Sequence, residues 1–457
     1  MANDRVIHVL SFLPAHHSHL LLASWVNRRL QSLTQTPKLW ARLLDNTPGP
    51  RLLEGYETRG TTMTPPGAWT SSATWTPNNI TGVDNIKQLH YPTLFQSRRL
   101  LDKVVRGRPL KGLPHVDTLH FSAPIYCIHA WGPWLILGGK DRSIQIWKTS
   151  IGKNELIKKV EDAHDGSVLA LSVDAWQEGA KLITGSSDGT AGVWDITWGS
   201  KKPVTSEVGQ PTGSEWEVEV VRAETLRGHT ASVLDVALAK DFIITASKDT
   251  TIRIYNRADY TLCRAIVGLH SGPVNCLALH PDPNVPEFIS ASGDGFWVRG
   301  PIEFPSFYTR HQTIDHNSDG SQALACVAWG GPLVVTGSKN AQLRAYDPIG
   351  EGLFELKRHT DSVRAIDLDV DQDREGTIVS ASYDQSVILW DAYSGQERYV
   401  FKPHSSIVLD VQLTGGRLIT YVSIEFKCVA DRSSASHDQT VQIRTFGTDL
   451  PYRDLFV

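Results

Sequence analysis

The sequence predicts a mostly β fold made of seven units of similar size, with a small helical segment ahead of them. Two observations carry this prediction: a pattern of strands and turns that recurs along most of the chain, and a different, helical period in the first 45 residues. The chain has 457 residues and a net charge of −4, which indicates neither nucleic acid nor membrane as a partner. No apolar run reaches the roughly 18 residues that span a bilayer.

The recurring unit is clearest in "AHDGSVLALSVDAWQEGAKLITGSSDGTAGVWD", residues 163–195. Short runs rich in β-branched residues alternate there with turn residues, which is the pattern of strands joined by tight turns. Comparable stretches occupy residues 123–148, 163–195, 228–256, 269–295, 321–347 and 358–391, and a seventh begins at residue 403.

Polar residues recur at fixed places in each unit. A His precedes the first strand, a hydroxyl lies on the second, an Asp sits in the next turn, and a Trp or Tyr follows on the third. In the second unit these are His164, Thr184 or Ser186, Asp188 and Trp194. Such groups can be buried only if they bond to one another, so a His–Asp bond is expected to pin the loop to the turn.

The other units supply further members of these predicted tetrads. Metal binding or acid–base chemistry is the alternative role for the His residues, but one His per unit would place them far apart. The further members are His229, Asp249, His270, His359, Asp384, Trp390, His404 and Asp438.

Several units depart from the pattern. The first lacks the His, Asn340 replaces the Asp in the fifth, and Tyr255 and Tyr346 replace the Trp in the third and fifth. The fourth unit ends in "FWVRGPIEF" without a Trp-Asp pair, which leaves its strand register open.

The seventh unit contains extra residues. Its His and Asp are 438 − 404 = 34 positions apart, against 188 − 164 = 24 in the second unit. Removing Tyr421 to Ser434 leaves "GGRLITASHDQTVQIR", a normal strand, turn and strand. We interpret this segment as translated non-coding sequence, from an unspliced intron or from an error in the gene model. The alternative is a real loop that leaves the sheet.

The repeats resemble the WD-repeat family over residues from about 113 to 447. The resemblance implies a seven-bladed β-propeller, assigned here to residues 113–450. A propeller must close its ring, so "GLPHVDTLHF" (112–121) is expected to supply the outer strand of the last blade. Residues 201–219 are expected to form a long loop between the second and third units.

The first 45 residues carry apolar side chains at helical spacing, which predicts three short helices. The segments "HVLSFL", "LASWVNRRLQSLT" and "LWARLL" resemble an F-box, although Met1 and Ala2 stand where that family has Leu-Pro. The resemblance implies docking onto the Skp-type adaptor of a cullin–RING ubiquitin ligase. The alternative is a helical cap on the propeller. The adaptor contacts implied are Val6, Leu10, Leu13, Leu21, Leu22, Trp25 and Trp40.

Residues 46–112 are expected to link the two parts, with a flexible loop at 61–79 and a helix within 91–110. The sequence contains no GxSxG, phosphate-loop, HExxH or CxxC motif, so no enzyme activity, cofactor or metal is expected. The five scattered cysteines are typical of reduced thiols, which places the protein in the cytoplasm or nucleus.

An F-box followed by WD repeats resembles the substrate-recognition subunits of SCF-type ubiquitin ligases, whose propeller holds the protein to be degraded. A WD-repeat scaffold without a ubiquitin role is the alternative. Lys140, Lys248 and Lys339 precede the turn Asp or Asn, and Arg364 follows "HTDSV". These four residues are predicted to form a basic patch for an acidic or phosphorylated segment. Ordinary solvated charge is the other interpretation.

Overall fold

A computed structural model describes thirteen stretches of the chain. The chain divides into two compact units, one of residues 1–115, 414–417 and 445–457, the other of residues 116–413 and 418–444. The predicted helical module of residues 1–45 lies outside the described residues, and so does most of the linker. The described residues are 61–62, 89–90, 115–131, 133–150, 152–176, 179–200, 216–303, 308–312, 323–370, 376–402, 404–414, 417–422 and 439–445. No helix in these stretches is long and apolar enough to cross a membrane.

In the first unit, strand β1 (Thr61–Thr62) pairs in parallel with β2 (Leu89–His90). The prediction of a flexible loop over residues 61–79 is therefore wrong for its first two residues. β-Branched threonines suit an extended strand, and the partner strand lies outside the segment on which the loop prediction was based.

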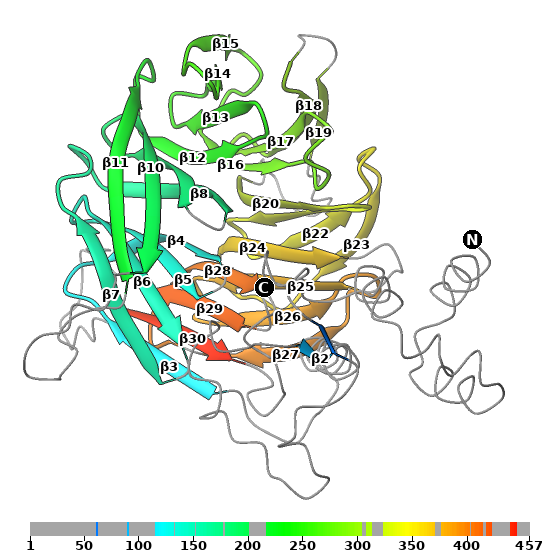
Figure 1. The fold of residues 1–457 in the computed structure, drawn as a ribbon. Coiled ribbons are helices and arrows are strands. Elements are labelled where there is room, and N and C mark those ends of the chain that lie inside the picture. Colours follow the sequence, from blue (N-terminus) through cyan, green and yellow to red (C-terminus); the bar gives the residue numbers. More distant parts are fainter. Residues whose placement is uncertain are drawn as a thin grey trace, which may run out of the picture. The chain divides into compact units, whose positions relative to one another are not determined.

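Seven four-stranded sheets form the second unit, one for each predicted repeat (Figure 1). Six blades contain four consecutive strands each. Blade one has β4 (Ile125–Trp131), β5 (Trp134–Gly139), β6 (Ile144–Ser150) and β7 (Lys153–Val160), and blade two has β8 (Val168–Trp176), β9 (Gly179–Ser186), β10 (Ala191–Ser200) and β11 (Trp216–Leu226). Blade three has β12 (Val233–Leu238), β13 (Phe242–Ser247), β14 (Ile252–Asn256) and β15 (Leu262–Ile266), and blade four has β16 (Val274–Leu279), β17 (Glu287–Ser292), β18 (Phe296–Pro301) and β19 (Thr309–Gln312). Blade five has β20 (Leu324–Gly330), β21 (Leu333–Ser338), β22 (Leu343–Tyr346) and β23 (Gly352–Leu356), and blade six has β24 (Val363–Val370), β25 (Gly376–Ser382), β26 (Val387–Asp391) and β27 (Glu397–Phe401).

Blade seven closes the ring. Its order is β28 (Val408–Thr414), β29 (Arg417–Val422), β30 (Thr440–Thr445) and then β3 (His115–His120), a strand that precedes blade one in the sequence. This confirms the prediction that the segment ahead of the first unit supplies the outer strand of the last blade. Pairing the two ends of the domain in one sheet leaves no open blade at the seam.

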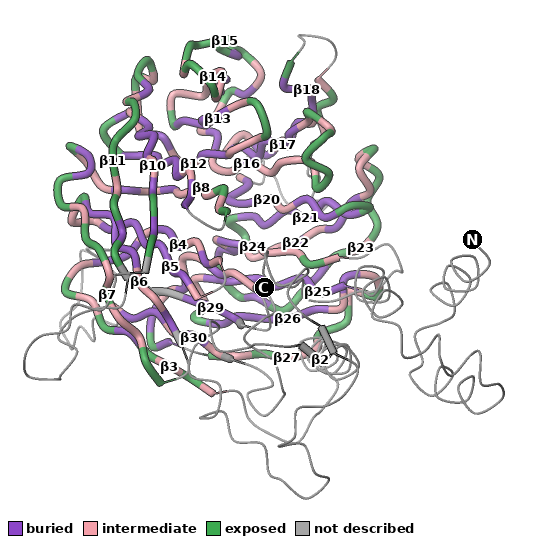
Figure 2. Tube along the Cα trace, viewed as in Figure 1, coloured by how far each residue is buried: buried purple, intermediate pink, exposed green. Residues whose placement is uncertain are grey.

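Burial follows the position of each strand within its blade (Figure 2). Every residue of β5 is buried, whereas β7, at the outer edge of the same blade, alternates between exposed and half-buried residues. Core clusters span neighbouring blades: Ile183 and Val193 of blade two pack with Val233 and Tyr255 of blade three. The hydrophobic core therefore lies between the faces of successive sheets.

The hairpin of β10 and β11 is longer than the sequence predicted. The expected loop over 201–219 is wrong for residues 216–219, because β11 begins at Trp216. The alternating "WEVEV" at its start fits a strand with one buried face. Trp198, near the end of β10, stacks on Trp131 and Trp134 of blade one, with ring centroids 5.7 and 5.3 Å apart.

Blade seven also corrects one boundary of the predicted insertion. Strand β29 continues through Tyr421 and Val422, so these two residues belong to the sheet. With them β29 has six residues, the same length as β13 in blade three. Residues 423–438 lie outside the described residues. In blade four, Trp297 of β18 pairs with Ala291 of β17, which fixes the register that the sequence left open.

Candidate functional site

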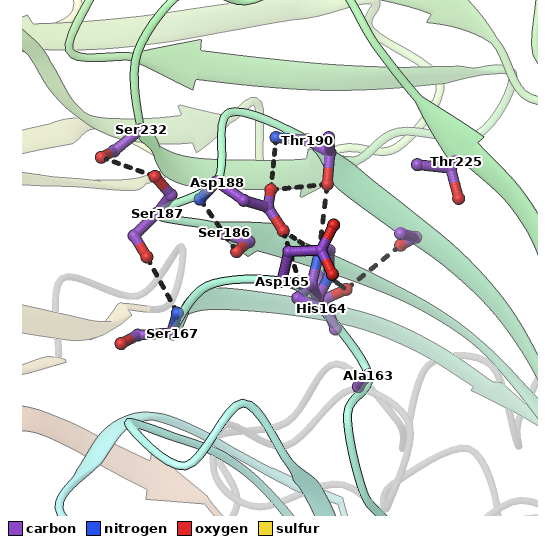
Figure 3. Close-up of polar contacts among 12 residues, drawn as sticks. Ala163, His164, Asp165, Ser167, Ser186, Ser187, Asp188, Thr190, Thr225 and Ser232 are labelled. Carbon is purple, nitrogen blue, oxygen red and sulfur yellow. Dashed lines mark hydrogen bonds and ion pairs between the residues drawn. The ribbon is translucent and has the colours of Figure 1, made fainter.

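The tetrad residues of blade two form a connected network, of which Figure 3 shows His164 and Asp188 together with Thr190. His164 Nδ1 lies 3.3 Å from Asp188 Oδ2, and its Nε2 lies 2.7 Å from Thr184 Oγ1. The indole N–H of Trp194 donates to the same Thr184 hydroxyl at 3.0 Å. His164 and Thr184 are buried. The network ties the loop before β8 to the second and third strands of the blade.

Asp188 also binds the backbone on both sides of the network. Its Oδ2 accepts the N–H of Asp165 at 3.0 Å, and its Oδ1 accepts the N–H and hydroxyl of Thr190 at 2.8 and 2.7 Å. Burial disfavours the charged carboxylate, but the hydrogen bonds from Thr190 outweigh it and hold the pKa of Asp188 below its usual value. Burial lowers the pKa of His164, which favours the neutral imidazole.

Blade three repeats the arrangement with one change. His229 Nδ1 lies 2.9 Å from Asp249 Oδ2, and its Nε2 lies 2.8 Å from Thr245 Oγ1. Tyr255, in the place of the Trp, donates its hydroxyl to the carbonyl of Arg227 at 3.2 Å rather than to the threonine.

Blade six has the complete set. His359 Nδ1 lies 2.9 Å from Asp384 Oδ2, and its Nε2 lies 2.8 Å from Ser380 Oγ. In blade seven, His404 lies 2.8 Å from Thr420 Oγ1 and 3.1 Å from Thr440 Oγ1. Asp438, predicted to complete that tetrad, lies outside the described residues.

Blade four keeps the polar part of the network but lacks the Trp. His270 Nδ1 lies 3.2 Å from Asp294 Oδ2, and Nε2 lies 2.9 Å from Ser290 Oγ. Gly300 follows Asp294 by six residues, as Trp194 follows Asp188. A side chain on Gly300 would overlap the ring of Tyr308, which occupies the space beside it.

Two replacements were missed by reasoning from the sequence. In blade one, which lacks the His, Lys159 Nζ lies 3.2 Å from Asp141 Oδ2. In blade four, Tyr308 fills the space over Gly300. Lys159 lies in β7, the outer strand of blade one. Tyr308 lies just before β19, the outer strand of blade four. The motif does not extend to these positions, so no signal in the sequence marks them. In blade five, Asn340 accepts a hydrogen bond from Ser338.

The three predicted lysines share one structural position. The N–H of Lys140 donates to Pro124 O at 2.8 Å, that of Lys248 to Ser232 O at 2.9 Å, and that of Lys339 to Ala323 O at 2.9 Å. Each bond fixes the turn between the second and third strands to the residue before the first strand. We call this position the turn slot. Its occupants in blades one to six are Lys140, Ser187, Lys248, Gly293, Lys339 and Tyr383, all with the same backbone bond.

The lysines therefore occupy the turn slots of alternate blades, namely one, three and five. Lys248 and Lys339 are exposed, and Lys140 is half-buried. Arg364 lies elsewhere, as the second residue of the inner strand β24, and is half-buried. Burial raises the pKa of Asp410 to about 7, and the nearby guanidinium of Arg364 partly opposes that rise.

The remaining predictions concern chemistry and docking. Within the stretches that the structure describes, no group of three or more His, Cys, Asp or Glu could hold a metal ion. Cys127, Cys263, Cys276 and Cys326 are free thiols. The predicted adaptor contacts, Val6 to Trp40, all lie outside the described residues.

Comparison with known proteins points to the same repeat. The family model for the WD domain, G-beta repeat, matches residues 113–148, 155–195, 221–256, 262–297 and 350–391. The crystal structure of the WD40 β-propeller domain of Doa1 superposes with a TM-score of 0.52, covering 74% of this chain and 98% of that one at 17% identity. At that identity the likeness concerns the fold alone.

Several curated proteins are similar to this chain at low identity. The Arabidopsis thaliana Protein ROOT INITIATION DEFECTIVE 3 is 26% identical over 48% of this chain and 46% of its own length. The Meyerozyma guilliermondii Ribosome biogenesis protein YTM1 is 25% identical over 70% and 66%. The Guanine nucleotide-binding protein subunit beta of Oryza sativa subsp. indica is 24% identical over 63% and 73%. The chain thus spans about half of the first relative and just under two thirds of the second.

Proposed function

Because the chain folds WD40 repeats into a seven-bladed propeller, we propose that it works by binding other proteins rather than by catalysis. The observation that carries this proposal is the turn slot. Six blades present the same backbone, fixed by the same hydrogen bond, with different side chains. A rigid ring with variable side chains suits recognition, because little order has to be imposed on binding. Two of the relatives are named as a ribosome biogenesis protein and as the beta subunit of a guanine nucleotide-binding protein.

More specifically, we propose a substrate-recognition subunit of an SCF-type ubiquitin ligase in the cytoplasm or nucleus. Support comes from the F-box-like pattern of residues 1–45 ahead of the propeller. The helical segment would dock on the Skp-type adaptor, and the propeller would hold the substrate protein. The cullin complex would then bring a ubiquitin-charged enzyme close to a substrate lysine, so the contribution of this chain to rate would be proximity.

Adaptor docking is tested with the full-length tagged chain and its Leu10→Glu/Leu13→Glu variant. The wild type should co-purify with a Skp-type adaptor and a cullin. The variant should lose both, because a charge on a helical apolar stripe cannot be buried at an interface. Lys158→Glu, a charge reversal at an exposed position on the outer strand β7, is the matched control. Absence of adaptor from the wild-type complex would favour the alternative, a WD-repeat scaffold without a ubiquitin role.

Partner recognition is tested separately. The Lys248→Glu/Lys339→Glu variant reverses two exposed turn-slot charges without touching the tetrads. If an acidic or phosphorylated segment binds there, capture of that partner should fall about tenfold or more, since two attractive contacts become repulsive. Lys153→Glu/Lys158→Glu, at two exposed positions of β7, changes the net charge by the same amount and is the control. Equal capture by the double variant and the control would remove these lysines from the binding surface and leave adaptor docking unaffected.

A further inference from the structure

The inner strands are joined by a ring of side-chain hydrogen bonds that runs in one direction. At every blade boundary, a side chain on the inner strand of one blade bonds to the backbone of the inner strand of the next. From blade six to blade seven, Asp367 Oδ2 accepts the N–H of Leu413 at 2.7 Å. From blade seven to blade one, Asp410 Oδ2 accepts the N–H of Ile128 at 3.4 Å.

The other boundaries carry equivalent bonds. Their side chains are Asp235, which accepts from Leu277 at 2.7 Å; Ser172, which accepts from Leu238 at 3.0 Å; Asn275, which donates to Leu324 at 2.6 Å; and Cys127 and Cys326, which donate to Val168 and Val363, each at 3.7 Å.

Among these side-chain-to-backbone bonds, a carboxylate is the acceptor at only three of the seven boundaries, and blade seven is the one blade with such a bond on both sides. Gln412 adds a neutral bond beside Asp410, since its Oε1 accepts the N–H of Ala130 at 2.6 Å. Blade seven is also the blade whose outer strand, β3, comes from the other end of the domain. The propeller is therefore closed by the blade whose inter-blade hydrogen bonds depend most on protonation.

The charges facing this pair are few. Asp410 is influenced by Asp367 and by Arg364, both on β24, and Asp367 is influenced by Asp369 on its own strand. The thiol of Cys127 on β4 has a pKa raised well above its usual value by burial, so it adds no charge near neutral pH. The same guanidinium also acts on Asp235 of blade three, so one guanidinium stands against four carboxyl groups. Ionising Asp367 and Asp410 together sets like charges close to one another between protein strands.

We propose that Asp367 and Asp410 act as a proton-dependent latch on blade seven. By this we mean that blade seven is packed more stably against its neighbours when both carboxyls are protonated, and less stably when both are ionised. The direction follows from their position between inner strands, where burial disfavours a charged carboxylate more than the accepted N–H bonds favour it. Burial raises the pKa of Asp367 to about 6 and that of Asp410 to about 7. A carboxyl whose folded pKa is raised stabilises the fold at low pH, and that stability is lost as the pH rises through the folded value. Blade seven is therefore held more tightly at pH 5.5 than at pH 8.

Hydrogen exchange of the full-length protein tests the latch. Protection factors, corrected for the pH dependence of intrinsic exchange, are compared at pH 5.5 and 8 for peptides from β28 and from β9. Blade two, with β9, is the internal reference because the side-chain-to-backbone bonds at its two boundaries come from Cys127 and Ser172 and involve no carboxylate. Protection of β28 relative to β9 should fall at least about tenfold, the effect of one pKa unit.

Two variants separate charge from hydrogen bonding. Asp367→Asn and Asp410→Asn keep an oxygen that accepts the N–H but remove the ionisation, so each should flatten the pH dependence in β28. Asp235→Asn makes the same change between blades three and four. It should keep a pH dependence in β28, with a midpoint shift at most, because Arg364 acts on Asp235 as well as on Asp410. A wild-type profile without the relative change would overturn the proposal, even if neither variant folds. So would Asn variants that keep the full pH dependence.

Discussion

Trp390 donates the N–H of its indole ring to Ser380 Oγ at 2.9 Å, which joins the third strand of blade six to the second. The same hydroxyl lies 2.8 Å from His359 Nε2. The two strands are already paired by backbone hydrogen bonds. This side-chain contact additionally fixes the positions of Trp390, Ser380 and His359 relative to one another in the core.

Replacing Ser380 with Ala should destabilise the protein by roughly 2–4 kcal/mol. Ser380 is fully buried, and its loss leaves the indole N–H and the imidazole nitrogen without a partner, at roughly 1–3 kcal/mol each. Urea denaturation followed by fluorescence would measure the change. The exposed Ser271→Ala should shift stability by less than about 0.5 kcal/mol. Equal effects of the two variants would mean that the tetrad bonds contribute nothing net.

Replacing Thr250 with Gly should stabilise the protein by about 1 kcal/mol. Thr250 follows the tetrad Asp249 with a φ of 73°, a conformation that is strained for a β-branched residue. Gly189 holds the same turn position in blade two with a φ of 83°. The reciprocal Gly189→Thr change should therefore destabilise by a similar or larger amount. Thermal melting of both variants tests the pair, and a loss of stability in Thr250→Gly would contradict the strain argument.

Gly300 and Tyr308 should show strong coupling. Gly300→Ala places a methyl group against the Tyr308 ring and should destabilise blade four, whereas Tyr308→Ala should cost about 3 kcal/mol through the cavity it leaves. In the double variant the methyl group has room, so its added cost should largely vanish. A double-mutant cycle by urea denaturation measures this, and additive effects would show that the two sites are independent.

His129 should make the free energy of unfolding fall as the pH falls. Burial lowers its pKa from 6.5 to about 4. A lowered folded pKa means that its contribution is complete above pH 6.5 and is lost as the pH falls toward 4. Between pH 7 and 4.5 the wild type should lose roughly 2–3 kcal/mol more than His129→Gln, which cannot take up the proton. Urea midpoints at the two pH values measure the difference, and parallel losses in both proteins would exclude this source.

Much of the fold followed from local pattern. The seven units and the tetrad positions of blades two, three and six could be read from the sequence because each network joins residues within about 25 positions, as with His359 and Asp384. The predicted loop at 216–219 failed because the pattern of β11 makes sense only once Val218 has a core to face. The sequence placed Lys140, Lys248 and Lys339 in the same kind of turn. How turns in alternate blades are placed relative to one another follows only from the arrangement of the blades in the propeller.

By itself, the sequence determined the number of blades, the order of the first three strands in each and the polar networks of blades two, three and six, since short-range spacing decides all three. Only the tertiary structure decided that Lys159 meets Asp141 where the His is missing, that Tyr308 stands over Gly300, and that Asp367 and Asp410 join blade seven to its neighbours. These contacts bring together groups on different strands, the last pair across the boundaries between blades. No periodicity records which side chain meets which backbone group once separate sheets pack side by side.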